Sequence, residues 1–111
     1  MDRIAFDDFL KVDMRLGTIT AVEPFPRARN ASWKITVDLG PELGERRTSA
    51  QATNYTPEEL TGMRVLCVVN FEPKNIAGFK SEVLLLGVPG EDGEISLLTA
   101  SRPAAPGGRV Y

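Results

Sequence analysis

The clearest pattern in this chain is a strict alternation of apolar and polar residues between positions 33 and 39. The residues run Trp33, Lys34, Ile35, Thr36, Val37, Asp38, Leu39. A period of two matches the side-chain alternation of a β-strand that buries one face. The segment therefore predicts a strand with one face in a core and the other in solvent.

Five further stretches predict strands, and turn residues separate them. These strands are expected at 12–23, 46–52, 63–69, 83–88 and 95–99. Gly17 is expected to bend or bulge the first of them. Prolines, glycines and short polar residues predict loops at 24–32 and 70–81 and turns at 40–44 and 89–93.

A short helix is expected between the third and fourth strands. Thr56 can cap it, Pro57 suits the first helical position, and Glu59 completes a Thr-x-x-Glu capping box, while Gly62 ends it. Three strands, a helix and two strands follow the order of the OB-fold, a small five-stranded all-β barrel. We therefore predict a single domain over residues 1–111, with an appended strand and an extended C-terminal tail.

The amino-acid composition excludes several kinds of catalytic and metal-binding site. The 111 residues include no histidine and a single cysteine, Cys67, which excludes a Ser-His-Asp triad, a Cys-His pair and a zinc site of histidines or four thiolates. We predict that the protein is not an enzyme and binds no metal or cofactor. One cysteine, no membrane-length apolar run and no signal-peptide pattern predict a cytoplasmic protein without membrane insertion.

A ligand site is expected on the second and third strands, because this face of the OB-fold and the two loops beside it bind ligands. Phe25, Phe71 and Phe79 fall in those loops, and the basic residues of the same segments are Arg27, Arg29, Lys34, Arg46, Arg47, Lys74 and Lys80. Rings interleaved with cations suit single-stranded nucleic acid, and they suit an extended peptide equally well. The alternatives are that the rings plug the open end of the barrel and that the charges form a solvated surface.

The two ends of the chain predict self-association. Phe6, Phe9 and Leu10 open the chain on a short segment that cannot bury them alone. Ile95 and Leu97 lie on the appended strand, which would leave an apolar edge, and such edges are normally paired or covered. A twofold dimer would bury both surfaces, so we predict a homodimer with these five residues at its interface.

Three motifs resemble those of the tRNA-binding domain family, which includes the domain appended to many methionyl-tRNA synthetases and free-standing bacterial homodimers. They are Phe9–Gly17, Tyr55–Gly62 and Asn70–Gly78, the last followed by Ser81 and Glu82. Within the family, the CsaA-type secretion chaperones are most similar, over residues 23–29, 49–51, 69–71 and 81–87.

The resemblance implies an OB-fold barrel that acts as a cytoplasmic homodimer and holds unfolded precursor proteins for the export machinery, without catalysis and without a cofactor. Relatives that bind tRNA usually have the sequence Ser-Glu-Gly-Met after the loop that corresponds to Asn70–Gly78. The methionine is among the residues tied to tRNA contact. Val83 and Leu84 replace that glycine and methionine here, which weakens the implied tRNA affinity. The tRNA therefore stands as an alternative or additional ligand of the same surface.

The two main hypotheses assign different roles to the same residues. For a peptide ligand, apolar contacts would come from Phe25, Phe71, Ile76 and Phe79, and hydrogen bonds to the backbone from Ser49, Gln51 and Asn70. The cations that would then favour acidic segments are Arg29, Lys34 and Lys74. For an RNA ligand, the residues that would pair with phosphates are Arg29, Lys34, Arg46, Arg47 and Lys74. Ser81 and Glu82 are included in the site because they match the family motif. A third hypothesis is a structural subunit that docks on a larger enzyme.

Overall fold

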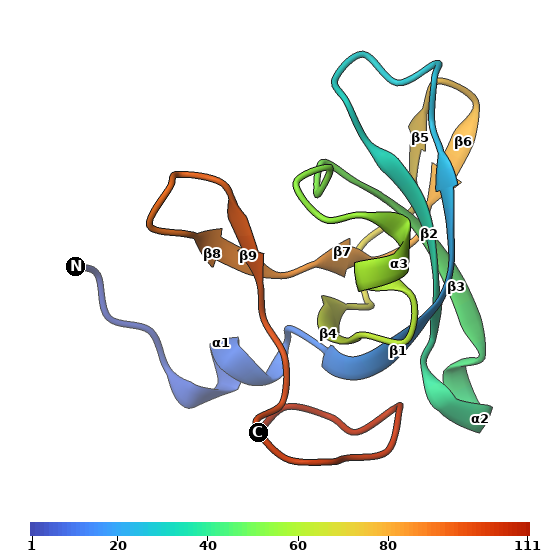
Figure 1. Ribbon diagram of the computed structural model, residues 1–111. Coiled ribbons are helices and arrows are strands. Elements are labelled where there is room, and N and C mark those ends of the chain that lie inside the picture. Colours follow the sequence, from blue (N-terminus) through green and yellow to red (C-terminus); the bar gives the residue numbers. More distant parts are fainter.

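The computed structural model describes residues 1–111, and its main feature is an antiparallel sheet that curls into a nearly closed barrel (Figure 1). Its five strands follow the order β3-β2-β1-β4-β7. The strands are β1 (Met14–Pro24), β2 (Trp33–Asp38), β3 (Glu45–Ala50), β4 (Arg64–Val68) and β7 (Leu84–Leu85). The all-β, five-stranded OB-fold barrel expected from the sequence is confirmed.

The alternation of residues in β2 sets which face of the sheet is polar. Ile35 and Val37 are completely buried, whereas Lys34, Thr36 and Asp38, which alternate with them, are partly exposed. Across the sheet, Lys34 pairs with Glu23 on β1 and with Ser49 on β3. The outer face of β1, β2 and β3 is therefore a polar surface, while the inner face supplies the core.

The irregularity expected at Gly17 lies further along β1. The β1–β2 register shifts between Ile19 and Ala21, and Gly17 itself pairs regularly with β4. A Cβ atom on Gly17 would overlap Val37 Cγ1 and would lie 2.8 Å from Leu39 Cδ2. The glycine is needed because the neighbouring strand comes this close, and a bulge expected at this residue lies between Ile19 and Ala21 instead.

The chain has three short helices. One precedes β1, namely α1 (Phe6–Leu10), and two connect strands, namely α2 (Gly40–Leu43) and α3 (Pro57–Leu60). The expected helix between the third and fourth strands is α3, and its capping box is confirmed. The Glu59 N–H donates to Thr56 Oγ1 at 3.1 Å, and the Thr56 N–H donates to the Glu59 carboxylate at 2.9 Å. None of the helices has the length and apolar character that a membrane span requires.

The hydrophobic core fills the barrel and includes Ile19, Ile35, Val37, Leu39, Leu60, Val65, Cys67, Val83, Leu85 and Leu97. Burial raises the pKa of the Cys67 thiol to about 12, so this thiol stays protonated and acts as a small core residue. Leu97, expected at a dimer interface, is buried in the core of its own chain, which accounts for its apolar character.

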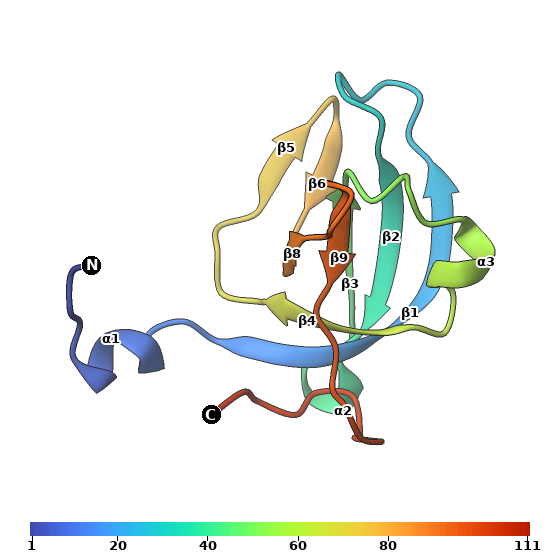
Figure 2. The ribbon, with the colours of Figure 1, turned by 60° about the vertical axis from the view of Figure 1, so that its left-hand side comes forward.

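The segment 70–81, expected to be an irregular loop, contains a hairpin. Its strands are β5 (Lys74–Ile76) and β6 (Phe79–Ser81), joined by Ala77 and Gly78. Both Figure 1 and Figure 2 place this hairpin beside the loop between β1 and β2. The two segments expected to flank a ligand site therefore do lie together in space.

The strand expected at 83–88 is broken at Leu86, whose N–H donates to the Leu66 carbonyl at 3.0 Å. This break separates β7 from β8 (Gly87–Pro89), which forms a second hairpin with β9 (Ile95–Leu97). The β8–β9 hairpin projects from a different part of the barrel than the β5–β6 hairpin (Figures 1 and 2).

The chain after β6 closes the barrel against β3. The Glu82 N–H donates to the Arg47 carbonyl at 2.8 Å. The buried hydroxyl of Thr48 donates to the Val83 carbonyl at 2.6 Å. These two hydrogen bonds join β3 to the chain that leads into β7, although β3 and β7 themselves share no regular ladder.

The C-terminal tail lies along the start of β1. The Gly107 N–H donates to the Leu16 carbonyl at 2.7 Å. Arg15 donates to Asp13 at 2.6 Å and to the Gly107 carbonyl at 3.1 Å. The hydrogen bond from Arg15, together with the charges of Arg15 and Arg109, holds the pKa of Asp13 below its usual value. A charged network thus ties the two ends of the chain together.

Candidate functional site

An apolar groove of about 790 Å³ opens beside the end of β3. Its other walls are the chain after β4, the β5–β6 hairpin, the chain around β7 and the start of β9. Seven of the ligand-binding residues predicted from the sequence line it, namely Ser49, Gln51, Phe71, Lys74, Ile76, Ser81 and Glu82. The structure thus brings together most, but not all, of the predicted site.

The groove offers unusually exposed apolar side chains to a ligand. Seven of its thirteen lining residues are apolar, and Phe71 and Leu84 remain 56% and 49% exposed. Large apolar side chains are rarely left in water inside a concave surface without a binding role. The groove is therefore suited to contact apolar groups of a ligand.

Six lining residues were absent from the ligand-binding set expected from the sequence: Ala50, Glu72, Val83, Leu84, Leu85 and Ile95. A signal for Leu84 was available. Its neighbours Val83 and Leu85 are core residues, so the period of two along a strand places Leu84 on the opposite face. Ile95, expected at a dimer interface, lines this groove.

Ser81 and Glu82 line the groove, but their polar atoms hold the barrel together. The Ser81 hydroxyl accepts the Ser49 N–H at 3.2 Å and lies 3.2 Å from the Thr48 hydroxyl. The Glu82 carboxylate accepts the Arg47 N–H at 3.1 Å. The matched family residues thus shape the groove wall in this structure.

Phe25 and Phe79 form a separate cluster with two cations, which we call the cation–ring cluster. The rings are buried, with centroids 5.3 Å apart in an edge-to-face arrangement. Lys34 Nζ lies 5.0 Å from the Phe25 centroid and 5.3 Å from the Phe79 centroid, and the Arg47 guanidinium lies 4.8 Å from the Phe79 centroid. These rings do not line the groove and are not part of the barrel core. Lys34 and Arg47 cover them on the outer face instead.

The cations expected to favour acidic ligands are divided between two places. Lys74 lines the groove, whereas Arg29 and Lys34 do not.

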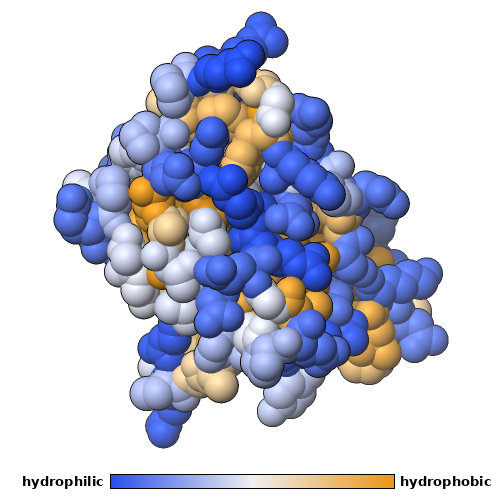
Figure 3. All heavy atoms as spheres, turned by 90° about the vertical axis from the view of Figure 1, so that its right-hand side faces the viewer, coloured by the Kyte–Doolittle hydropathy of each residue, from blue (hydrophilic) through white to orange (hydrophobic).

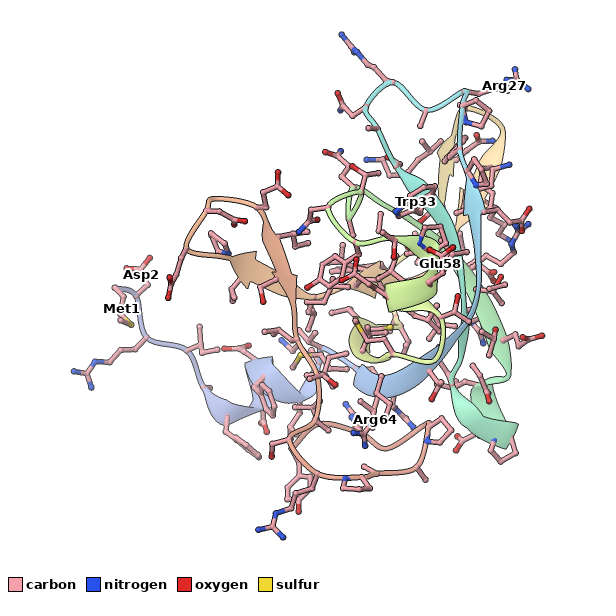
Figure 4. All side chains as sticks on the ribbon, viewed as in Figure 1. Met1, Asp2, Arg27, Trp33, Glu58 and Arg64 are labelled. Atoms are coloured by element: carbon pink, nitrogen blue, oxygen red, sulfur yellow. The ribbon has the colours of Figure 1, made fainter.

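Arg27 points outward from the loop between β1 and β2, and Trp33 points inward (Figure 4). The indole N–H of Trp33 donates to the Tyr55 carbonyl at 3.1 Å. Figure 3 shows the face over β1 and β3 as a hydrophilic surface broken by separate hydrophobic patches.

The side chain of Asn70 is hydrogen-bonded within the protein at both its oxygen and its nitrogen. Its side-chain oxygen accepts the Asp13 N–H at 3.0 Å, and its side-chain nitrogen donates to the Lys11 carbonyl at 2.7 Å. Both ends of the amide are thus occupied by the chain segment after α1, and Asn70 does not line the groove. Asn70 is joined to the groove through the next residue, Phe71, which lines it.

The residues expected at a dimer interface fall in three environments. Phe6 and Leu10 are 69% and 44% exposed on α1, which has no buried residue of its own. Phe9 is half-buried, with its ring centroid 5.9 Å from that of Phe6. Ile95 lies in the groove and Leu97 in the core. The helix α1 is therefore the surface where an apolar face lacks a partner within the chain.

The structure contains no group of three or more metal-ligating side chains. The chain has no histidine, and its one cysteine, Cys67, is buried in the core and does not line the groove. The residues of the groove can pack against apolar groups, donate and accept hydrogen bonds and carry charge.

Comparisons with known proteins agree on one family. Residues 14–109 match the model of the putative tRNA-binding domain. A methionine–tRNA ligase of Porphyromonas gingivalis is 36% identical over 108 residues, which cover 96% of this chain and 15% of the ligase. The chain thus spans about a seventh of the length of such relatives.

Solved structures of similar size are also found. The CsaA chaperone protein from Picrophilus torridus is 40% identical and superposes with a TM-score of 0.93, covering 98% of this chain and all of that one. The chaperone CsaA from Bacillus anthracis is 43% identical with a TM-score of 0.91, covering 99% of this chain and all of that one.

Proposed function

The chain belongs to the tRNA-binding domain family. From that membership and from the groove, we propose that it is a non-catalytic chaperone that holds apolar segments of unfolded precursor proteins in the cytoplasm before export. The observation that carries the proposal is the groove of about 790 Å³ with Phe71 and Leu84 exposed inside it. Similarity to CsaA chaperones over essentially their whole length supports the same function. The proposal includes transfer of the bound precursor to the export machinery.

The groove has the features that an extended polypeptide needs. Ser49 and Gln51 stand at the end of β3, where they can bond a peptide backbone, and Phe71, Ile76 and Leu84 supply apolar contacts. An unfolded client loses conformational freedom when it is ordered, so the dissociation constant is expected to be on the order of micromolar.

Fluorescence anisotropy with labelled peptides from unfolded precursors tests the proposal. Replacing Phe71→Ala should weaken binding by about fivefold or more, because central aromatic contacts each carry over 1 kcal/mol in interfaces. Leu84→Ser should act in the same direction. Tyr111→Ala is the matched control, since Tyr111 is fully exposed at the chain end and outside the groove. Unchanged affinity in both groove variants would refute peptide binding at this place.

A second candidate is tRNA binding on the outer face of β2 and β3. Lys34 sits on the cation–ring cluster without a carboxylate within ion-pair distance, and Arg27, Arg29 and Lys80 also lack ion pairs. Cations without a carboxylate partner are free to pair with phosphates. The buried rings of Phe25 and Phe79 would then support the cations without stacking on bases.

A tRNA titration between about 50 and 200 mM salt separates this candidate from peptide binding, because phosphate contacts release counterions and lose affinity steeply with salt. A double replacement, Arg29→Ala with Lys34→Ala, should lower tRNA affinity, whereas Arg3→Ala in the N-terminal segment should not. Peptide affinity should change little with salt. Absence of tRNA binding even at low salt would remove the candidate.

We also propose a homodimer in which α1 is part of the interface. The exposed side chains of Phe6 and Leu10 would be buried by a second copy, as apolar faces of obligate interfaces are. Sedimentation equilibrium should find a dimer for the wild type and a monomer after the paired replacement Phe6→Ser and Leu10→Ser. A monomeric wild type, or a variant that still dimerises, would contradict the assignment.

A further inference from the structure

A second, polar cavity of about 390 Å³ continues the apolar groove toward the β8–β9 hairpin. Gln51 and Ile95 line both spaces, so they stand at the boundary between them. The remaining walls are Thr53, Asn54, Gly93 and Glu94. A chain extended along the groove would therefore meet an apolar space first and a polar space next.

Hydrogen bonds fix the frame of this polar cavity and leave acceptor groups free. The side-chain nitrogen of Asn54 donates to the Ile95 carbonyl at 3.0 Å, which ties the hairpin to the segment after β3. The Glu94 N–H donates to the Asp92 carboxylate at 2.9 Å, and the Glu94 carbonyl accepts the Gly90 N–H at 2.6 Å. The Glu94 carboxylate itself has no ion pair.

The charges around the two spaces are opposite to those expected from the sequence. Three carboxylates, Glu72, Glu82 and Glu94, and one cation, Lys74, line them, which gives a formal charge of −2. Arg29 and Lys34, expected to favour acidic segments, line neither space. An unpaired carboxylate beside free amide and hydroxyl groups accepts hydrogen bonds from an ammonium or guanidinium group.

We propose that the polar cavity is a side-chain subsite in which Glu94 receives a lysine or arginine that flanks the apolar segment held in the groove. This proposal rests on the peptide-binding function proposed above and adds a rule of selection to it. The apolar groove supplies most of the affinity, and Glu94 decides which apolar segments are preferred. Segments with an acidic residue at the same place are disfavoured by repulsion.

Peptides that share one Phe-Leu anchor in a Gly-Ser background, with Lys, Gln or Glu at each flanking position in turn, test the subsite by fluorescence anisotropy. At one flanking position the wild type should bind the Lys peptide about three- to fivefold more tightly than the Gln peptide, the gain expected of a partly exposed ion pair, and the Glu peptide more weakly still. Glu94→Gln should abolish this preference.

The matched control is Glu91→Gln, on the same turn but outside both cavities. It changes the net charge by the same amount as Glu94→Gln, so it should keep the preference for Lys. A preference that survives in Glu94→Gln, is lost equally in Glu91→Gln, or is absent from the wild type overturns the subsite. If Phe71→Ala still weakens every peptide while no Lys preference is found, only the subsite is wrong; if Phe71→Ala has no effect, the peptide-binding function itself fails.

Discussion

Glu82 and Arg47 join the two edges of the barrel through a reciprocal pair of hydrogen bonds. The Glu82 N–H donates to the Arg47 carbonyl at 2.8 Å, and the Arg47 N–H donates to the Glu82 carboxylate at 3.1 Å. The same residue therefore closes the barrel and forms part of the groove wall. The stability of the fold and the shape of the site are coupled at this point.

Replacement of Glu82 tests that coupling. Glu82→Ala removes the acceptor of the Arg47 N–H and should lower the free energy of unfolding by about 1 kcal/mol, the usual net value of one hydrogen bond. Glu82→Gln keeps an acceptor oxygen and should cost less. Urea unfolding followed by the fluorescence of Trp33 measures both. Equal stability of the wild type and the alanine variant would show that the carboxylate does not support the closure.

Asn70 should act as a positioning residue for Phe71. Asn70→Ala removes two hydrogen bonds to the segment after α1 and should lower stability by about 1 kcal/mol. It should also weaken peptide binding, because the backbone before Phe71 loses its anchor. Asn30→Ala, in the loop between β1 and β2, is the control. Anisotropy that finds normal peptide affinity for Asn70→Ala would limit its role to stability.

The pKa of Asp13 predicts a defined sensitivity to acid. Because Arg15 holds the pKa of Asp13 below 3.8 in the folded chain, the unfolded chain takes up the proton first as pH falls. The stabilisation is complete above the unfolded pKa and is lost as pH drops from about 4 through the folded value.

Asp13→Asn should therefore be less stable than the wild type at pH 7, and the two curves should converge below about pH 4. Urea unfolding at several pH values between 3 and 7 measures the difference. Asp2→Asn, at an exposed residue without a partner, should follow the wild type throughout. A constant difference between wild type and Asp13→Asn across this range would contradict the linkage.

The turn of the β5–β6 hairpin carries removable backbone strain. Ala77 has a φ of +49° and Gly78 a φ of +84°, a conformation in which a non-glycine residue costs roughly 1 kcal/mol. Asparagine tolerates this region better, so Ala77→Asn should raise the free energy of unfolding by about 0.5–1 kcal/mol. The melting temperature should rise accordingly, whereas Ala104→Asn in the tail should leave it unchanged. A fall in melting temperature for Ala77→Asn would refute the interpretation.

Local patterns in the sequence determined the framework of this protein. The alternation in β2 and the capping box of α3 predicted the barrel because side-chain period and helix capping depend on near neighbours in the chain. The absence of histidine directed the search toward binding. The two phenylalanines of segment 70–81 were also visible in the sequence, and Phe71 lies in the groove as expected.

Only the tertiary structure decided what each of those side chains does. Phe71 and Phe79 come from the same loop, yet one is 56% exposed and the other is buried under Lys34 and Arg47. Lys34 was expected in the ligand site but covers the rings of Phe25 and Phe79, whereas Glu94, which no sequence pattern singled out, lines the polar cavity beside the groove. These outcomes depend on contacts between residues far apart in the chain, and no local pattern encodes which face of a hairpin meets which strand.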